Sequence, residues 1–281
     1  MKSPSSFAAL QCCLLALWGV SFAVSLHAQS AATPPKNRML TLAYMKTEPG
    51  KASDYVKLER EVWKQVHQDM VNQGRLTSWK LYVVSWPNGE EQEYDYVTMM
   101  EYPSFAHLES PYAGTDFSKV LGQAKYAELQ SMTPAVRKLR RTDTLSVLLA
   151  TVGWSTASNP ILNVHYLRSL PGKSDDLLKS QREYFLPSSG ELVKSGNAAS
   201  WATTSLRYPV QLDFPYNYVS FNGYESLAQM EKDPPQAWRD KWQGARATEN
   251  SALLAASRKR VKGQLWRLID QTAPRPLDAN R

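Results

Sequence analysis

YMKTEPGK, residues 44–51, returns 166 − 44 = 122 residues later as YLRSLPGK, residues 166–173. At that offset, residues 44–109 align with residues 166–231 without a gap, and 20 of the 66 aligned pairs are identical. The identical pairs include Pro49/Pro171, Gly50/Gly172, Lys51/Lys173, Trp79/Trp201, Tyr94/Tyr216 and Tyr96/Tyr218. The chain therefore contains an internal duplication, and we expect both copies to fold in the same way.

The first copy predicts the order strand, helix, strand, strand, helix, strand. Residues 39–45 alternate as a strand, and the turn at residues 48–51 leads into a helix that Gly74 ends. An apolar stripe at helical spacing marks this helix, made of Tyr55, Leu58, Val62, Val66 and Met70. Residues 76–86 and 94–101 predict a hairpin. A second helical region follows from Pro103 to about Arg141, and residues 145–150 predict the last strand.

The second copy repeats this plan. Its strands are predicted at residues 161–167, 198–208, 216–222 and 265–269, with helices from about Ser174 and from Glu225. Pro187 stands where the first copy has Gln65. Because proline lacks the amide proton of a helix interior, we expect the first helix of this copy to break near Leu186 and to restart at Ser188 or Ser189.

This order is that of the ferredoxin-like, or split βαβ, unit, in which two helices cover one face of an antiparallel sheet. The bare face of each sheet needs a cover, and in a tandem copy the other repeat can supply it. The sequence thus predicts an α+β fold of two tandem ferredoxin-like (βαββαβ) units, packed sheet to sheet. We place repeat 1 at residues 38–152, repeat 2 at 160–271 and a flexible tail at 272–281.

The N-terminus has the features of an export signal. Lys2 precedes a mostly apolar run over residues 7–24, and Ala28 offers a cleavage point, with Ala32 as a second candidate. We therefore expect a signal peptide at residues 1–28 and a linker at 29–37; the alternative is an uncleaved membrane anchor. Cleavage would remove both cysteines, Cys12 and Cys13, so no disulfide could form. These features predict a periplasmic or secreted bacterial protein without a membrane span after cleavage.

The mature chain would carry 33 − 1 = 32 basic and 26 acidic residues, a net charge of +6. Two basic clusters, residues 137–141 and 258–262, lie at matching places near the ends of the two repeats. We interpret each as the exposed last turn of a helix, where cations interact favourably with the helix dipole. We expect no nucleic-acid partner. The oligomeric state, monomer or homodimer, stays open.

The repeated motifs resemble the dimeric α/β-barrel superfamily in its tandem, two-unit form. The resemblance rests on a strand that ends in tyrosine, a Pro-Gly-Lys turn that opens a helix, a tryptophan-bearing strand and a tyrosine-rich strand. Within that superfamily, residues 224–228 (YESLA) followed by Asp233, Pro234 and Trp238 are similar to the NIPSNAP family. The resemblance implies an internal barrel. Members include cofactor-free monooxygenases, isomerases, haem proteins and proteins without known activity, so the fold leaves the function open.

His165 and Arg182 are the candidate catalytic residues. His165 replaces Ala43 of the first copy, so the fold does not require a histidine there, and it could act as a general base near neutral pH. Arg182 and its counterpart Arg60 lie at the margin of the apolar helix stripe, where a guanidinium could reach a bound carboxylate. The alternatives are a hydrogen-bonded interior histidine and arginines that extend to solvent.

The second hairpin carries the richest face for ligand binding. One face of the first strand carries Trp201, Thr203, Ser205 and Arg207 at every second position, and Tyr216 and Tyr218 follow on the next strand. Their counterparts in the first copy include Trp79 and Tyr96, and with Arg60 these complete the set of candidate ligand-binding residues. The alternative is that the aromatic side chains only pack the two sheets together.

The sequence therefore favours an exported protein that binds a small aromatic or apolar molecule, with cofactor-free monooxygenase or isomerase activity as its expected chemistry. We expect no cofactor and no metal, because the mature chain has no cysteine and its histidine spacing matches no ligand motif. The alternative is a non-catalytic, stress-associated interaction protein of the NIPSNAP type. Haem binding ranks lower, because the helices of the second copy contain no histidine.

Overall fold

The computed structural model describes residues 38–87, 89, 92–211 and 213–275. All of them belong to one compact unit. The predicted signal peptide, the predicted linker and the last six residues lie outside the described residues. Thr272, which the sequence places in the flexible tail, is buried, and its backbone N–H donates to the carbonyl of Trp79 at 3.0 Å. The ordered chain thus continues past the last strand.

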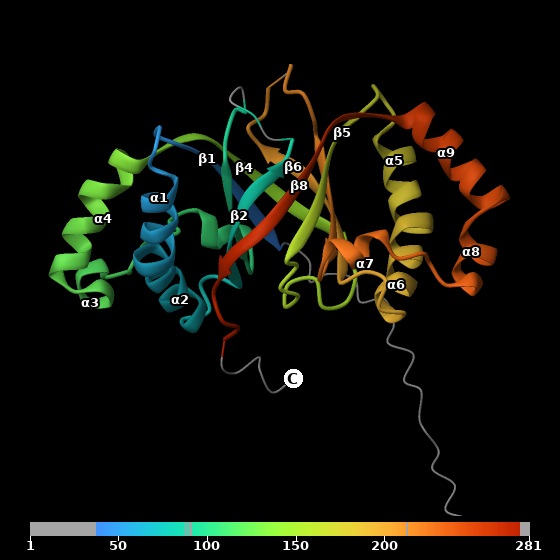
Figure 1. The fold of residues 1–281 in the computed structure, drawn as a ribbon. Helices are drawn as coiled ribbons and strands as arrows, with labels where there is room; N and C mark the ends of the chain where they lie inside the picture. Colours follow the sequence, from blue (N-terminus) through green and yellow to red (C-terminus); the bar gives the residue numbers. More distant parts are fainter. Residues whose placement is uncertain (1–37, 88, 90–91, 212, 276–281) are drawn as a thin grey trace, which may run out of the picture. The chain divides into compact units, whose positions relative to one another are not determined.

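The two halves contain matching elements (Figure 1). The first half comprises β1 (Met39–Thr47), α1 (Ala52–Leu58), the π-helical turn η1 (Glu59–Trp63), α2 (Lys64–Asn72), β2 (Ser78–Trp86), β3 (Tyr96–Tyr102), the 3₁₀ turn η2 (Phe105–Leu108), α3 (Phe117–Leu121), α4 (Gln123–Val136) and β4 (Arg137–Ala150). The second half comprises β5 (Ile161–Ser169), α5 (Ser174–Ser180), the π-helical turn η3 (Gln181–Phe185), α6 (Leu186–Lys194), β6 (Ser200–Tyr208), β7 (Tyr218–Tyr224), α7 (Leu227–Glu231), α8 (Gln236–Trp242), α9 (Ala245–Ser257) and β8 (Arg258–Gln271).

The eight strands form one closed antiparallel barrel in the order β1-β3-β2-β8-β5-β7-β6-β4. Each half contributes four consecutive strands, and the halves are joined where β2 pairs with β8 and where β4 pairs with β6. Helices α1–α4 lie on one side of the barrel and α5–α9 on the other (Figure 1). The structure therefore confirms the predicted α+β fold of two βαββαβ halves.

Strand register defines which positions of the halves are equivalent. Tyr44 pairs with Arg141 across β1 and β4, and Tyr166 pairs with Lys262 across β5 and β8. The numbering offset between equivalent residues of the two halves is thus 122 as far as β7. It is 121 in the last helix and the last strand of each half. The same shift appears in the backbone bonds from Glu48 N to Val136 O and from Leu170 N to Ser257 O, of 3.0 and 2.8 Å.

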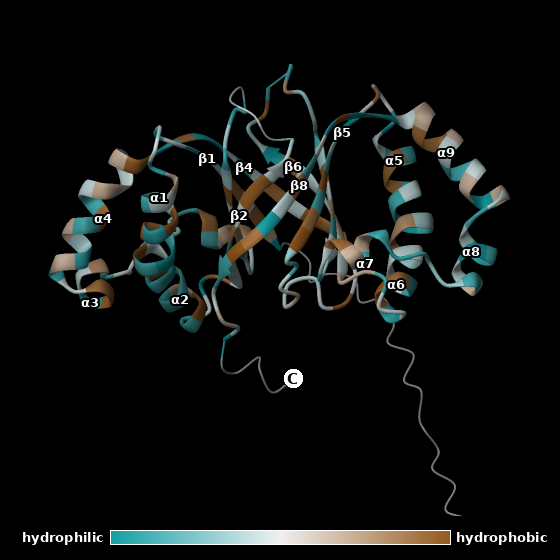
Figure 2. Ribbon diagram, viewed as in Figure 1, coloured by the Kyte–Doolittle hydropathy of each residue, from teal (hydrophilic) through white to brown (hydrophobic). Residues whose placement is uncertain are grey.

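Three hydrophobic clusters fill the fold. One lies inside the barrel and includes Leu42, Tyr44, Tyr166, Phe221 and Trp266. A second lies between the first half's sheet and its helices and contains 17 buried residues. Among the described residues, the buried members of the corresponding cluster in the second half are Leu167, Leu177 and Tyr218. Hydrophobic residues gather along the barrel strands in Figure 2, as expected for strands buried on both faces.

Both basic clusters lie in strands, which corrects the prediction of exposed helix ends. The last helices stop at Val136 and Ser257, and Arg137 and Arg258 already have extended backbones, with φ of −154° and −151°. Residues 137–141 pair with β1 and residues 258–262 with β5. Hydrogen bonding to a neighbouring strand therefore outweighs the modest dipole interaction that favoured a helix terminus.

Pro187 does not break its helix, so that prediction is also wrong. The helix changes to π-helical geometry at Gln181–Phe185 and then continues through Pro187 in α6. The first half has the same π-helical turn at Glu59–Trp63, where the sequence contains no proline. The irregularity therefore belongs to the fold of both halves, and Pro187 occupies the first turn after it, where the missing N–H is tolerated.

His67 makes the first half's core sensitive to acid. Its ring stacks between Trp63 and Trp79, with centroid distances of 5.7 and 5.3 Å, and burial lowers its pKa to about 3. The unfolded chain binds a proton at His67 below about pH 6.5, whereas the native state does not, so this residue destabilises the fold by about 1.4 kcal/mol per pH unit as the pH falls further.

We expect His67→Phe to reduce the loss of unfolding free energy between pH 7 and pH 4.5, measured by urea denaturation. The comparison between variant and wild type is needed because Glu59 acts in the opposite direction. Burial raises the pKa of Glu59 to about 7, so acidification protonates it first in the native state and stabilises the fold. Equal losses in the two proteins would contradict the assignment to His67.

Candidate functional site

The predicted hairpin face points toward the helices of the second half, not into the barrel. Trp201 is 2% exposed, and its ring is parallel to that of Phe185 in η3, at a centroid distance of 6.5 Å and an angle of 9°. Tyr218 is buried with Leu177 of α5. Both aromatic residues therefore pack the helices onto the sheet. The candidate binding site is therefore formed by the polar residues that lie beside them.

Tyr216 does not share this face, contrary to the alternation assumed from sequence. It lies inside the barrel, whereas Tyr218 packs with the helices. The strand begins only at Tyr218, and the side chain of Asn217 accepts a hydrogen bond from the backbone N–H of Ser169 at 2.9 Å. This side-chain contact interrupts the regular ladder, so the period-two pattern does not extend back to Tyr216.

Three other candidates lie apart from the hairpin centre. Arg207 is exposed, and its Nε donates to Ser146 Oγ of β4 at 2.7 Å beside a groove of about 410 Å³. Ser205 is half-buried on the same strand. Arg182 is exposed on η3. The structure does not bring these three side chains together with His165.

His165 lies in a polar row across the second sheet. It pairs with Ser220 of β7, which in turn pairs with Thr203 of β6. Residues paired directly across neighbouring strands point to the same face, and Tyr218 places this face on the helix side. The equivalent row of the first half is Ala43, Thr98 and Leu81. The second half has therefore replaced two apolar side chains of this row by polar ones.

The same replacement recurs throughout the layer between sheet and helices. Six positions that are buried and apolar in the first half are polar in the second: Ala43/His165, Leu58/Ser180, Val66/Ser188, Leu81/Thr203, Leu129/Asn250 and Val136/Ser257. Five of the six polar residues are buried, and His165 is half-buried. The fold itself is satisfied by apolar side chains at these positions, as the first half demonstrates. We call the polar set the second-half polar layer.

A groove of about 450 Å³ leads to this layer between α5, η3 and α9. Ser180 and Asn250 lie along it, and Ser180 Oγ donates to Asn250 Oδ1 at 2.5 Å. In the first half, Leu58 and Leu129 occupy these positions within the hydrophobic cluster. The second half therefore has a hydrogen-bonded contact next to a solvent-accessible groove. At the same place the first half has a buried contact between apolar side chains.

Several buried polar atoms in this layer or next to it lack a hydrogen-bond partner among the described residues. They are Thr203 Oγ1, Gln181 Oε1 and His165 Nδ1. Thr203 is fully buried and Gln181 is 2% exposed. Because buried polar groups are almost always paired, such atoms are where a bound molecule or ordered water would supply the missing partner.

His165 is neutral at physiological pH. Burial lowers its pKa to about 4, and the nearby cations Arg260 and Arg258 contribute in the same direction. A neutral imidazole has one nitrogen that accepts a proton or a hydrogen bond. His165 can therefore serve as an acceptor or a weak base toward a bound molecule, and an anion bound nearby would raise its basicity.

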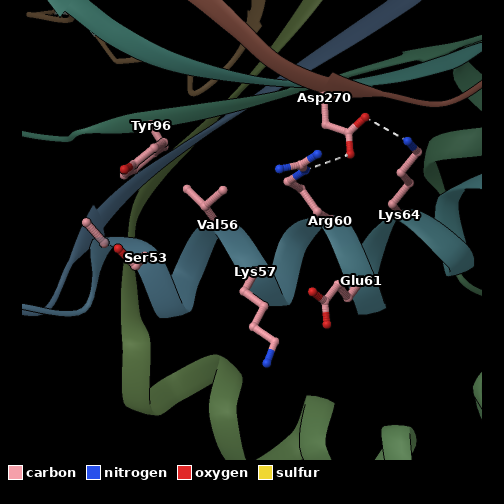
Figure 3. A pocket seen from close by; sticks show the side chains of 9 residues that line it. Ser53, Val56, Lys57, Arg60, Glu61, Lys64, Tyr96 and Asp270 are labelled. Carbon is pink, nitrogen blue, oxygen red and sulfur yellow. Dashed lines mark hydrogen bonds and ion pairs between the residues drawn. The ribbon is translucent and has the colours of Figure 1, made fainter.

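Arg60 and Tyr96 line a second groove, of about 690 Å³, on the first half (Figure 3). Arg60 and Lys64 both extend from the helix toward Asp270 of β8, with N–O distances of 3.4 and 2.7 Å. Lys57 and Glu61 point away from that carboxylate (Figure 3). The cations nearest Asp270 are thus already paired with it. Trp79 lies beneath His67 in the core and does not reach the groove.

A polar network that the sequence did not predict lies inside the barrel. Four tyrosines, equivalent in pairs, meet there: Tyr44, Tyr94, Tyr166 and Tyr216. Tyr44 and Tyr216 donate to Asp143, the former at 2.8 Å, while Tyr94 and Tyr166 donate to Gln264 at 2.7 and 3.3 Å. Each acceptor thus binds one tyrosine of its own half and one of the other half. The network joins the two halves at the centre of their pseudo-symmetry.

Two cations complete this network, one from each half. The Arg141 guanidinium lies 4.1 Å from the centroid of the Tyr44 ring and pairs with Asp143 at 3.4 Å. Lys262 lies 4.7 Å from the Tyr94 centroid and donates to its hydroxyl at 3.2 Å. Burial raises the pKa of Asp143, and burial raises the pKa values of the four tyrosines. The hydroxyls therefore stay protonated as donors, which suits a structural role.

Among the described residues, no group of three or more His, Cys, Asp or Glu side chains could hold a metal ion. In the same part of the chain, no helix combines the length and the apolar character that crossing a bilayer requires.

No family model and no curated protein matches this sequence. Its fold is similar to that of a candidate monooxygenase from Fusobacterium nucleatum, with 9% identity, a TM-score of 0.53 and coverage of 84% of this chain and 94% of that chain. A candidate monooxygenase from Lactobacillus acidophilus gives 7% identity, a TM-score of 0.51 and coverage of 85% and 97%. At these identities the similarity shows the fold alone, that of the dimeric α/β barrel.

Proposed function

We propose that this protein binds a small organic molecule between the sheet of its second half and the helices that cover it. The second-half polar layer is the observation that carries this proposal. The same fold is built with apolar residues at the six equivalent positions of the first half, so the polar side chains are not needed for folding. Departures from the packing rules of a fold are expected at functional sites.

The energetics of burial support this function. Burying a polar group without a partner costs about 1–3 kcal/mol, and Thr203 and Gln181 each present such an atom. The second half also has a much smaller apolar cluster between sheet and helices, so it forgoes hydrophobic stabilisation as well. A bound molecule that fills the layer and pairs with these atoms would offset both costs.

His165 is the residue that we propose for chemistry. A monooxygenase or isomerase that uses no cofactor needs a base that removes a proton from its substrate. A neutral imidazole beside Thr203 and Ser220 can accept that proton and hydrogen-bond the product. Proton abstraction from a small substrate is therefore the reaction that best fits this layer. The two candidate monooxygenases of the same fold are consistent with such chemistry, though they show the fold alone.

The double variant Ser180→Leu, Asn250→Leu tests the site by giving the second half the residues of the first. We expect the free energy of unfolding to stay unchanged or to rise by about 1 kcal/mol, because both hydrogen-bonding partners are replaced together. We expect ligand binding to be lost, because leucine side chains fill the layer. A thermal-shift screen of small aromatic acids, quinones and lactones would identify hits with the wild-type protein, and the variant would then be tested against them.

The control is Ser180→Ala, Asn250→Ala, which removes the hydrogen bond but leaves space. This variant should retain binding of the same hits. Wild-type protein that binds no compound of the screen, or a leucine variant that binds as well as wild type, would overturn the proposal.

The alternative function is a non-catalytic interaction protein, and one observation favours it. Trp201 and Tyr218 are 2% and 7% exposed, as expected if the hairpin aromatics serve only for packing. Because these side chains are buried, a ligand that enters from solvent cannot contact them directly. Their burial does not explain the six polar replacements. An isolated His165→Ala variant that changes stability without changing any binding would favour this alternative.

A further inference from the structure

One of the substitutions between the halves removes a buried negative charge. Glu59 opens the π-helical turn η1 of the first half, and Gln181 opens the matching turn η3 of the second. Both side chains are 2% exposed. The exchange keeps the size and shape of the side chain and deletes only its charge, so the electrostatic environments of the two layers can be compared directly.

In the first half this charge has a partner. Glu59 Oε1 lies 3.9 Å from Arg137 Nε at the start of β4, and both side chains are largely shielded from solvent. Arg137 pairs with Thr47 at the end of β1. Above about pH 7, where Glu59 is ionised, the first half thus contains a buried carboxylate that balances a buried guanidinium.

In the second half the cation is retained and its counter-ion is lost. Arg258 takes the place of Arg137 and pairs with Ser169, the counterpart of Thr47. Its side chain is half-buried, and among the described residues no acceptor pairs with its guanidinium. Burial and the neighbouring Arg260 lower the pKa of Arg258, which indicates that its charge is poorly compensated.

The second half has also gained groups that favour an anion. Arg260 and His165 lie where the first half has Leu139 and Ala43, on the same face as Arg258. The half-buried Arg258 and the exposed Arg260 thus both lie near the imidazole of His165, and the neutral Gln181 stands where the first half has Glu59. The apolar residues beside them are Leu167, Leu177 and Leu254.

We propose that the second half binds an organic carboxylate beside Arg258, and that its anionic group supplies the negative charge that Glu59 supplies in the first half. Arg258 would hold the carboxylate, since a planar guanidinium binds it in a bidentate manner. The apolar body of the ligand would lie against Leu167 and Leu254. This inference rests on the proposed function and names its ligand class. A neutral ligand would leave Arg258 without a counter-ion, which is why the charge is part of the proposal.

The substitution Gln181→Glu tests this inference by restoring the internal carboxylate. The first half shows that the fold accommodates glutamate beside arginine at this position, so the variant should fold. We would measure binding of benzoate by calorimetry and by the ¹H–¹⁵N signals of His165, with benzamide and inorganic phosphate as parallel probes. We expect wild type to bind benzoate in preference to both, and Gln181→Glu to weaken benzoate binding at least about tenfold.

The NMR signals provide a second readout. Benzoate bound beside Arg258 should raise the pKa of His165 in wild type, because an adjacent negative charge favours the imidazolium. In Gln181→Glu the pKa of His165 should already be raised without benzoate. The control is Lys194→Gln, which changes the net charge equally at an exposed position at the end of α6. It should bind benzoate as wild type does.

Each outcome bears on one proposal. Equal benzoate affinity in wild type and Gln181→Glu would overturn the carboxylate inference, as would benzamide binding as tightly as benzoate. In the latter case the small-molecule site itself would stand. Preferential binding of phosphate would assign an inorganic anion and would also overturn the inference. Wild type that binds none of the three probes would overturn the carboxylate inference, whereas the small-molecule site would be overturned only if the screen of aromatic acids, quinones and lactones also gave no hit.

Discussion

Trp266→Ala should lower the free energy of unfolding by about 3–5 kcal/mol, because it opens a large cavity in the barrel core. Trp266 is fully buried on β8 and pairs with Val84 of the first half and Leu162 of the second. Its ring contacts Tyr82 and Phe221, at centroid distances of 5.9 and 6.3 Å, one residue from each half. Denaturation in urea, followed by fluorescence and by circular dichroism, measures this loss.

The same experiment tests whether the halves unfold together. Because both halves share the barrel interior, we expect a single transition at the same midpoint for both probes. Trp86→Ala is the control, since this tryptophan is on β2 at the same junction but 51% exposed, and its loss should change stability by less than about 0.5 kcal/mol. Two separate transitions, or equal effects of the two substitutions, would contradict the shared core.

Asp143→Ala should destabilise the protein by about 3–5 kcal/mol, the cost of breaking a buried ion pair from one side. Asp143 is fully buried, accepts hydrogen bonds from Tyr44 and Tyr216 and pairs with Arg141. Alanine would remove the carboxylate that accepts from both hydroxyls, and it would leave the Arg141 guanidinium with the exposed Glu93 as its remaining ion-pair partner. Urea denaturation at pH 7 provides the measurement.

Asp143→Asn is the informative companion variant. Gln264 performs the acceptor role in the second half without a charge, so an amide is compatible with the tyrosine network. We therefore expect asparagine to cost clearly less than alanine. Asp270→Ala removes an acid that pairs with Arg60 and Lys64 at the protein surface and should cost less than about 1 kcal/mol. Equal losses in all three variants would contradict the role assigned to the network.

The duplication made the fold predictable from sequence. An offset of 122 residues and two kinds of periodicity placed the helices and strands, and the need to cover two bare sheets predicted the barrel. The boundaries of the last strands were missed, since residues 137–141 and 258–262 are polar and alternate weakly. Their strand conformation depends on pairing with β1 and β5, a long-range contact that local pattern does not reveal.

The candidate site was predictable in location and only partly in composition. The sequence favoured the second half because the hairpin of that half carries the more polar face. The sequence contains a further signal. A comparison of the two copies position by position directly identifies the substitutions Glu59/Gln181 and Leu58/Ser180. The tyrosine network could not be anticipated in the same way, because the break in alternation before Tyr96 and Tyr218 depends on the side chains of Asp95 and Asn217.

Closure of the barrel within one chain has an evolutionary consequence. In a homodimer of identical subunits, every substitution appears twice. A substitution that weakens packing therefore destabilises the assembly at two places. Fusion of the two subunits into one polypeptide lifts that constraint. One half can then keep the apolar layer that stabilises the whole molecule, while the other half can acquire polar groups for a new function.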